Sequence, residues 1–190
     1  MRIIAGSLKG RLFEAPKGHK SHPMGDKQRG ALFNTLGDIT GLTVLDLYAG
    51  TGALSFEAIS RGASRVTAVE LDQTAQDSIV NNIHSLGLQE SVTLASSRVA
   101  SWSKKHITDW YDVVLCDPPY DRVLEGSIQK LTTHVARGGI FVLSWPSKLS
   151  IPEFKSLELI KSNTYANARI IFYKKPISMQ TPLDENRFLS

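Results

Sequence analysis

The sequence predicts an α/β fold in which helices wrap a central, mostly parallel β-sheet. From residue 43 onward, apolar strand-like runs alternate with helical segments, a glycine turn joins the first such strand to its helix, and two β-rich runs come last. Alternation of this kind is typical of parallel strands joined by crossover helices. The 190 residues, 42% hydrophobic and 21% charged, suit one globular domain with appendages.

An N-terminal extension is expected over residues 1–40. Two short extended runs, Arg2–Ala5 and Arg11–Ala15, flank a connection bounded by glycines and predict a β-hairpin. A helix follows, with Asp26 as its expected N-cap and Gly37 as its stop. Its apolar side is formed by Leu32, Phe33 and Leu36.

The main domain is expected over residues 41–175. Its predicted parallel strands are Val44–Tyr48, Arg65–Glu70, Val92–Ala95, Asp112–Cys116 and Ile140–Ser144. The predicted helices are Ala53–Ser60, a second one capped by Asp72 or Thr74 and ended by Gly87, and a third marked by Leu124, Ile128, Leu131 and Val135 before a tight turn at Gly138-Gly139. Leu157–Lys161 and Ala168–Lys174, joined across Ser162 to Thr164, are expected to pair antiparallel, and residues 176–190 to form a loosely held tail.

Composition narrows the classes of protein that fit. The single cysteine, Cys116, cannot form an internal disulfide, which favours a reducing compartment. No apolar run reaches membrane-spanning length, and the first ten residues lack the apolar region of a signal peptide. The histidines show no metal-ligand spacing. We therefore expect a cytoplasmic protein, a monomer, without a metal.

Positive charge is concentrated at the N-terminus. The whole chain carries a net charge of +4, whereas its first 30 residues hold seven basic against two acidic residues, a net of +5. Such a local field attracts polyanions, because phosphate contacts supply affinity without reading sequence. On charge alone, a solvated basic face explains the segment equally well.

A glycine turn follows the first predicted strand. Gly50 and Gly52 lie between Val44–Tyr48 and the next helix, where a missing Cβ lets a ligand approach the backbone. The third glycine of a dinucleotide fingerprint is replaced by Ser55, which argues against a nicotinamide dehydrogenase. Asp46 favours a ligand with a positive portion. The turn by itself is also compatible with a purely structural role.

Glu70 ends the second predicted strand, 18 residues after Gly52. At this position an acid can accept hydrogen bonds from the hydroxyls of a nucleoside ribose. A favourable charge at the start of the next helix is the alternative.

The fourth predicted strand runs directly into Asp117-Pro118-Pro119-Tyr120. In the sheet order three-two-one-four-five, strands one and four are neighbours, so the glycine turn and Asp117–Tyr120 become two walls of one crevice. An exocyclic amine of a base is a poor nucleophile and needs acceptors for both of its hydrogens. The Asp117 carboxylate and the Pro118 carbonyl provide them, while Tyr120 can stack on the base. The methyl group of S-adenosyl-L-methionine is the electrophile that this arrangement suggests.

Several segments of the chain form a recognisable combination: the N-terminal MRIIAG and LKGR, the stretch from His22 to Asn34, the run LDLYAGTGALSFEAISRGA, Glu70 and CDPPY. Together they resemble the RsmD family of bacterial small-subunit ribosomal RNA guanine-N2 methyltransferases. The resemblance covers residues 1–174. It implies a class I Rossmann-like methyltransferase whose substrate is ribosomal RNA in an assembling small subunit, with the N-terminal segment beside cofactor and target.

The resemblance also completes the set of expected site residues. Catalytic roles are expected for Asp117, Pro118, Pro119 and Tyr120. Cofactor binding is expected for Asp46, Tyr48, Ala49, Gly50, Thr51, Gly52, Glu70, Leu71, Ser97 and Asp117, and RNA binding for Arg2, Lys9, Arg11, Lys17, Lys20, His22, Lys27 and Arg29. The chain departs from the family pattern at His22, Met24 and Gly30, and at Ser97, where an aspartate commonly contacts the adenine amino group.

Two alternatives remain open from the sequence. The same motif fits a methyltransferase for another planar amine, such as adenine N6, cytosine N4 or a glutamine amide. A non-catalytic RNA-binding or ribosome assembly protein of the same fold is the other.

Overall fold

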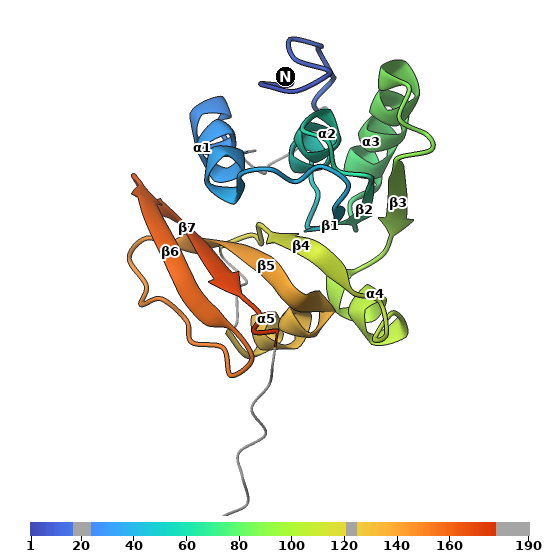
Figure 1. Cartoon of the computed structure of the whole chain (residues 1–190). Helices are drawn as coiled ribbons and strands as arrows, with labels where there is room; N and C mark the ends of the chain where they lie inside the picture. The colour runs from blue at the N-terminus through green and yellow to red at the C-terminus, as the bar shows by residue number, and fades with distance from the viewer. Residues whose placement is uncertain (17–23, 121–124, 178–190) are drawn as a thin grey trace, which may run out of the picture.

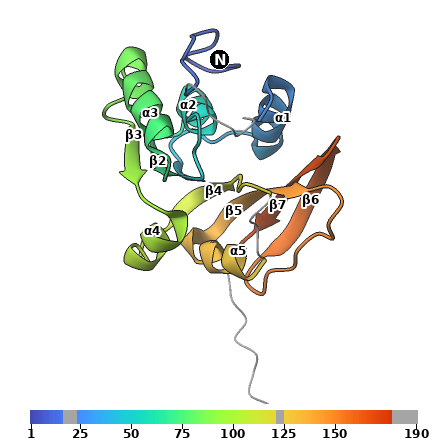
Figure 2. The same cartoon turned by 180° about the vertical axis from the view of Figure 1, so that it is seen from behind.

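The computed structural model describes residues 1–16, 24–120 and 125–177, which form one seven-stranded β-sheet between two layers of helices (Figures 1 and 2). The strands are β1 (Thr43–Leu47), β2 (Arg65–Glu70), β3 (Val92–Ser96), β4 (Tyr111–Cys116), β5 (Val135–Pro146), β6 (Glu158–Tyr165) and β7 (Ala168–Lys174). The helices are α1 (Asp26–Leu36), α2 (Ala53–Ser60), α3 (Gln73–Leu86), α4 (Val99–Lys105) and α5 (Glu125–Leu131), which is followed by a 3-10 turn at Thr132–His134.

The sheet order is β3-β2-β1-β4-β5-β7-β6. The first five of these strands are parallel and follow the predicted order, while β7 pairs antiparallel with both β5 and β6. The mostly parallel sheet with an antiparallel end is therefore confirmed. Because the strand order reverses between β1 and β4, their carboxyl ends border the crevice in which such folds bind ligands.

The two faces of the sheet carry separate apolar cores. The hairpin region, α1, α2 and α3 lie over one face, and α4 and α5 over the other (Figure 1). Side chains alternate along β1, so Val44 packs into the first core and Leu45 and Leu47 into the second. By the same alternation, Asp46 lies on the α2 side.

Most predicted elements are present with small changes of boundary. Helix α2 and strands β2 and β7 have the predicted bounds. Asp72 caps α3 by accepting the Ala75 N–H at 2.9 Å, and Gly87 ends it at φ +73°. Helix α1 differs, since Gly25 is its N-cap and Asp26 its first residue. The expected hairpin is reduced to one antiparallel bridge between Arg2 and Leu12.

In the second half of the chain, one helix was missed and two predictions were wrong. Helix α4 was not predicted, because it has seven residues and buries only Val99 and Trp102. Val135 begins β5 and does not continue a helix, and Gly138-Gly139 lie inside β5, where its register with β4 shifts. The final turn falls after Tyr165 and not at Ser162 to Thr164. Leu124 and residues 178–190 lie outside the described residues.

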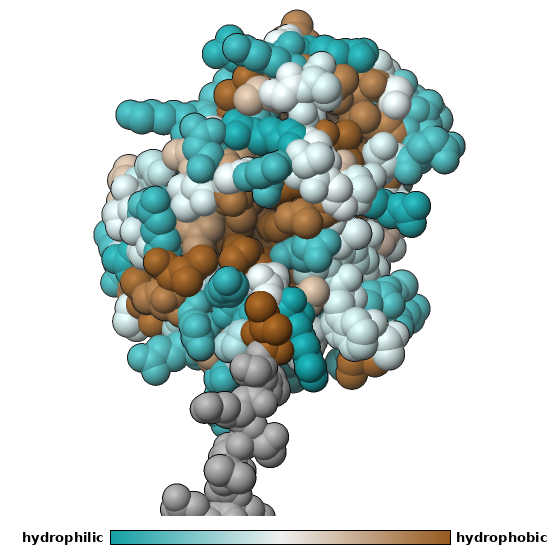
Figure 3. All heavy atoms as spheres, viewed as in Figure 1, coloured by the Kyte–Doolittle hydropathy of each residue, from teal (hydrophilic) through white to brown (hydrophobic). Residues whose placement is uncertain are grey.

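The surface includes a partly apolar edge. Leu159 and Ile160 of β6 are 51% and 54% exposed, and apolar residues are visible over this strand in Figure 3. Over the described ranges, none of the helices is both long and apolar enough to cross a membrane.

Candidate active site

The candidate site lies at the neighbouring carboxyl ends of β1 and β4. The two strands pair in parallel up to Leu47 and Cys116, and one step later the Asp117 N–H donates to the Leu47 carbonyl at 3.5 Å. The glycine turn and the Asp117–Tyr120 segment thus start from directly neighbouring backbone positions. This arrangement is the one that the strand order predicts.

The glycine turn has an unusual backbone path. Tyr48 has a φ of +65°, Gly50 of +55° and Gly52 of +75°, so the chain enters the left-handed region at three of five consecutive positions. Residues other than glycine rarely adopt such φ angles, and backbone strain like that at Tyr48 is typical of a functional turn. A Cβ on Gly50 would meet only the Tyr48 carbonyl, at 3.8 Å, whereas one on Gly52 would come within 2.8 Å of the Phe56 ring. Gly50 therefore leaves open space, and Gly52 permits packing inside the protein.

Asp46 is a fully buried carboxyl group beneath this turn. Its Oδ2 accepts a hydrogen bond from the Ser55 hydroxyl at 2.6 Å, while its Oδ1 has no partner among the described residues. Burial raises the pKa of Asp46 to about 7; the Ser55 hydrogen bond opposes the rise, and the nearby acids Asp117 and Glu70 add to it. Ser55, which replaces the third glycine of a dinucleotide motif, thus donates a hydrogen bond to Asp46.

Glu70 links the glycine turn to the segment that follows β2. Its carboxylate accepts the Gly50 N–H at 2.7 Å and the N–H groups of Leu71 and Asp72 at 2.8 Å. A carboxylate has about four acceptor positions, so three are in use here. The Ser97 N–H donates to the Glu70 carbonyl at 2.9 Å, which places Ser97 at the same edge of the sheet.

The opposite wall consists of Asp117–Tyr120. Asp117 is partly exposed, Pro118 is buried, and Pro119 and Tyr120 are exposed. Burial raises the pKa of Asp117, and a hydrogen bond from Ser144 opposes this rise. The Tyr120 hydroxyl lies 2.7 Å from the Ser144 hydroxyl. A small cavity of about 10 Å³ beside Asp117 is lined by residues that include Met24 and Leu32 of the N-terminal extension.

The basic residues expected to bind RNA have different environments. Lys9 and Lys27 are exposed. Arg2 is exposed and pairs with Asp26 at 3.2 Å, and Arg11 donates to the Ser85 carbonyl at the end of α3 at 2.9 Å. Lys17, Lys20 and His22 lie outside the described residues.

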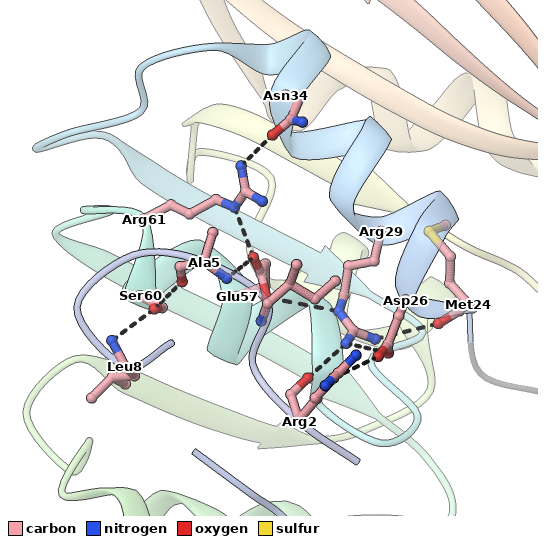
Figure 4. Close-up of polar contacts among 11 residues, drawn as sticks. Arg2, Ala5, Leu8, Met24, Asp26, Arg29, Asn34, Glu57, Ser60 and Arg61 are labelled. Carbon is pink, nitrogen blue, oxygen red and sulfur yellow. Dashed lines mark hydrogen bonds and ion pairs between the residues drawn. The ribbon is translucent and has the colours of Figure 1, made fainter. Parts of the chain in front are cut away.

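Arg29 corrects the sequence-based expectation. Its side chain is completely buried, so it cannot contact an RNA in this structure. Its guanidinium donates to Asp26 at 2.9 Å and to the backbone carbonyls of Arg2 and Met24 (Figure 4). A basic residue within a charged segment looks exposed in the sequence, but this one holds the hairpin region and α1 together.

Glu57 attaches the same extension to α2. The fully buried carboxylate accepts the N–H groups of Ile4 and Ala5 at 2.8 and 3.1 Å and the Arg61 Nε–H at 2.7 Å, and lies 3.8 Å from the Arg29 guanidinium (Figure 4). Ser60, one turn later, accepts the Leu8 N–H at 2.9 Å. Because α2 starts at the glycine turn, these bonds fix the extension relative to both walls.

Sequence reasoning missed Ser55, Ser144, Glu57 and the structural role of Arg29. Ser144 could have been found, because it is the last residue of the predicted fifth strand, which neighbours strand four. The buried pair of Glu57 and Arg29 joins two helices, and such packing leaves no local signal. Within the described part of the chain, no cluster of three or more His, Cys, Asp or Glu side chains is arranged to hold a metal ion.

Comparisons with known proteins agree with this geometry. Residues 1–174 match the family described as "Conserved hypothetical protein 95". The Bacillus subtilis protein named "Putative rRNA methyltransferase YlbH" is 30% identical over 92% of this chain and 99% of its own length. "Ribosomal RNA small subunit methyltransferase D" of Escherichia coli K12 is 32% identical over 69% of this chain and 66% of its own.

A solved structure extends the likeness to three dimensions. The chain described as "Putative methyltransferase yhhF from Escherichia coli" superposes with a TM-score of 0.82 at 26% identity, covering 94% of this chain and 99% of that one. The likeness therefore includes the N-terminal extension as well as the sheet. This chain belongs to the "Conserved hypothetical protein 95" family, the RsmD family, and is a methyltransferase of Rossmann-like fold.

Proposed function

We propose that this methyltransferase uses S-adenosyl-L-methionine to methylate the N2 amine of a guanine in small-subunit ribosomal RNA. The observation that carries the proposal is the direct contact of the two walls, where the Asp117 N–H meets the Leu47 carbonyl at 3.5 Å. It brings a nucleoside-type site and an amine-binding motif within reach of each other. The names of the relatives supply the class of RNA.

The glycine-turn wall has the chemistry that the cofactor requires. Asp46 Oδ1 is a buried acceptor without a partner in the described chain, which suits a nearby ammonium group. Glu70 suits a ribose diol, provided that its carboxylate gives up part of its hold on Gly50, Leu71 and Asp72. Ser97 lies where the adenine of the cofactor is expected to bind. The open space at Gly50 lets the cofactor approach the protein backbone closely. When bound, the cofactor supplies an electrophilic methyl group.

The Asp117–Tyr120 wall would orient the target amine. The Asp117 carboxylate and the Pro118 carbonyl accept its two hydrogens, so that the nitrogen lone pair faces the glycine turn, and the exposed Tyr120 ring stacks on the base. Proline contributes no competing N–H and keeps the backbone rigid. The base must leave its stack to enter this crevice, which is typical of enzymes that act on bases.

RNA binding is assigned to the basic residues that the fold leaves exposed. Arg2, Lys9, Arg11 and Lys27 of the extension would contact phosphates, which provide affinity and register. Arg29 is withdrawn from this set because it is buried.

Incubation with ribosomal particles tests the function. Small-subunit particles that lack the modification are mixed with the protein and methyl-labelled S-adenosyl-L-methionine, and the RNA is digested to nucleosides for mass spectrometry. We expect the label in N2-methylguanosine. Label in methyladenosine, methylcytidine or protein would show that a different planar amine is the substrate, and RNA binding without label would show that the protein does not catalyse this transfer.

A further inference from the structure

The carboxyl end of β5 contributes a hydroxyl group to the Asp117–Tyr120 wall. Strand β5 pairs in parallel with β4 up to Leu143 and Cys116, so Ser144 is the residue next to Asp117 in the neighbouring strand. Ser144 is only 5% exposed, and it lines the same small cavity as Asp117. Its position is therefore fixed by the sheet and not by a loop.

The Ser144 hydroxyl contacts the Tyr120 side chain and lines the same small cavity as Asp117. Its Oγ lies 2.7 Å from the Tyr120 hydroxyl; burial raises the pKa of the neighbouring Asp117 carboxyl group, and the interaction of Ser144 with that group lowers it. A serine hydroxyl has one hydrogen to donate and two lone pairs to accept. Since a carboxylate can only accept, a hydrogen bond between Ser144 and Asp117 has Ser144 as its donor, and Ser144 then accepts from Tyr120. In this arrangement the three groups form a hydrogen-bonded chain that runs from the phenol through the serine to the carboxylate.

This hydrogen-bonded arrangement affects the position of the Tyr120 ring and the ionisation of the Asp117 carboxyl group. The Tyr120 ring follows two prolines on a partly exposed segment, and its hydroxyl is held by a side chain of the rigid sheet. The Asp117 carboxylate gains a donor that favours its ionised form, in a place where burial favours the neutral acid. The ionised form accepts through both oxygens, so that one can bind Ser144 and the other a substrate amine.

We propose that Ser144 is a positioning residue of this methyltransferase, whose single hydroxyl fixes the plane of the Tyr120 ring and keeps the Asp117 carboxylate oriented as a charged acceptor. The proposal rests on the proposed function and adds to it a third side chain, from a strand that carries none of the expected site residues.

The variants Ser144→Ala, Tyr120→Phe and the double variant test the proposal. We expect Ser144→Ala to lower kcat about 10-fold and to raise KM for the ribosomal particle, with the Kd of S-adenosylhomocysteine within about twofold of wild type. Ser144→Thr, which keeps the hydroxyl, should recover most of the rate. In the double variant the two effects should be less than additive, because each single change breaks the same hydrogen bond. Ser162→Ala, at an exposed serine of β6, is the control and should change nothing.

A pH profile separates positioning from a general loss of stability. Activity requires the Asp117 carboxylate, so kcat/KM falls as the pH drops through the pKa of Asp117. Loss of the Ser144 donor raises that pKa further, and the acidic limb of Ser144→Ala should move to higher pH. An unshifted limb with additive rate losses would overturn the proposal, as would equal losses in Ser144→Thr and Ser144→Ala.

One readout does not depend on turnover. Carbon-13 NMR of the Asp117 carboxyl in the free protein should show a higher pKa in Ser144→Ala than in wild type. If wild type fails to methylate particles but this shift is seen, the proposed function is wrong and the hydrogen-bonded chain stands. If wild type is active and the carboxyl titrates identically in both proteins, the inference about Ser144 is wrong.

Discussion

At the scale of single residues, burial of the Asp46 carboxyl group costs free energy that its contacts within the described residues do not fully offset. Its carboxyl group is fully buried, only one oxygen is hydrogen-bonded, and burial raises its pKa to about 7. A folded-state pKa above the unfolded value of about 3.9 means that the folded protein binds more protons. The stability that this proton provides is present at low pH and is lost as the pH rises through about 4 to 7. A residue kept at such a cost indicates a functional site.

The variant Asp46→Asn should therefore gain more stability over wild type at pH 8 than at pH 5. An amide cannot ionise, and its oxygen can still accept from Ser55. We expect the unfolding temperature at pH 8 to rise by roughly 3–6 °C, which corresponds to about 1–2 kcal/mol for a chain of this size. S-adenosylhomocysteine should bind more weakly, because the negative charge near its ammonium is lost.

Differential scanning calorimetry at both pH values and calorimetric titration measure these two effects. Asp77→Asn, at an exposed position of α3, is the control. A variant that is equally destabilised at pH 5 and pH 8 would show that Asp46 is a structural carboxylate.

At the scale of elements, the N-terminal extension is held by a small set of buried polar groups. Ile3 and Phe13 pack against the α2 side of the core, with the Phe13 and Phe56 rings 5.2 Å apart, and Glu57 binds the backbone of Ile4 and Ala5. The extension also brings Met24 and Leu32 next to Asp117. The position of the extension is thus set by its contacts with α2, the helix that begins at the glycine turn.

Glu57→Gln should loosen this extension while sparing the cofactor wall. The amide keeps one acceptor oxygen but removes the charge that faces Arg29 and Arg61, and breaking a buried ion pair costs about 3–5 kcal/mol. We expect faster hydrogen exchange at the amides of Ile4 and Ala5, weaker binding of ribosomal particles, and nearly unchanged affinity for S-adenosylhomocysteine.

Hydrogen-exchange mass spectrometry follows the first effect and binding assays the other two, at a temperature where the variant is folded. Glu90→Gln, an exposed carboxylate at the end of the α3–β3 connection, is the matched control. Unchanged exchange at residues 3–8 would show that the Glu57 charge does not hold the extension.

Prediction of the elements from sequence succeeded where the spacing of apolar residues agreed with the capping and terminating residues. Helix α3 has four apolar residues at helical spacing, an Asp72 cap and a Gly87 stop, and all of these features are present. Helix α4 has two buried residues in seven and carries no such signal. Val135 was misplaced because one apolar residue at the right spacing cannot tell a helix end from the start of a strand.

At the scale of the whole molecule, the topology produces the site. The order β3-β2-β1-β4-β5 brings the ends of β1, β2 and β4 to one edge, and with them the glycine turn, Glu70 and Asp117. This much follows from alternating strands and helices, and so the strand order and the placement of these segments at one edge could be predicted from sequence. Contacts that depend on side-chain rotation, such as Ser55 to Asp46 or Ser144 to Tyr120, could not, because they follow from packing in three dimensions.

The central claim is that the two walls of the crevice have separate tasks, one for the cofactor and one for the amine. Comparison of Asp117→Ala with Glu70→Ala tests it most directly, by measuring for each variant the Kd of S-adenosylhomocysteine and the single-turnover rate on ribosomal particles at saturating cofactor. We expect Asp117→Ala to lose at least about 100-fold in rate with its Kd within about twofold of wild type. Glu70→Ala should weaken the Kd about 10-fold or more, since hydrogen bonds to a charged group are worth about 1.5–3 kcal/mol. Equal loss of affinity and rate in both variants would contradict the division of tasks and place Asp117 in the cofactor site.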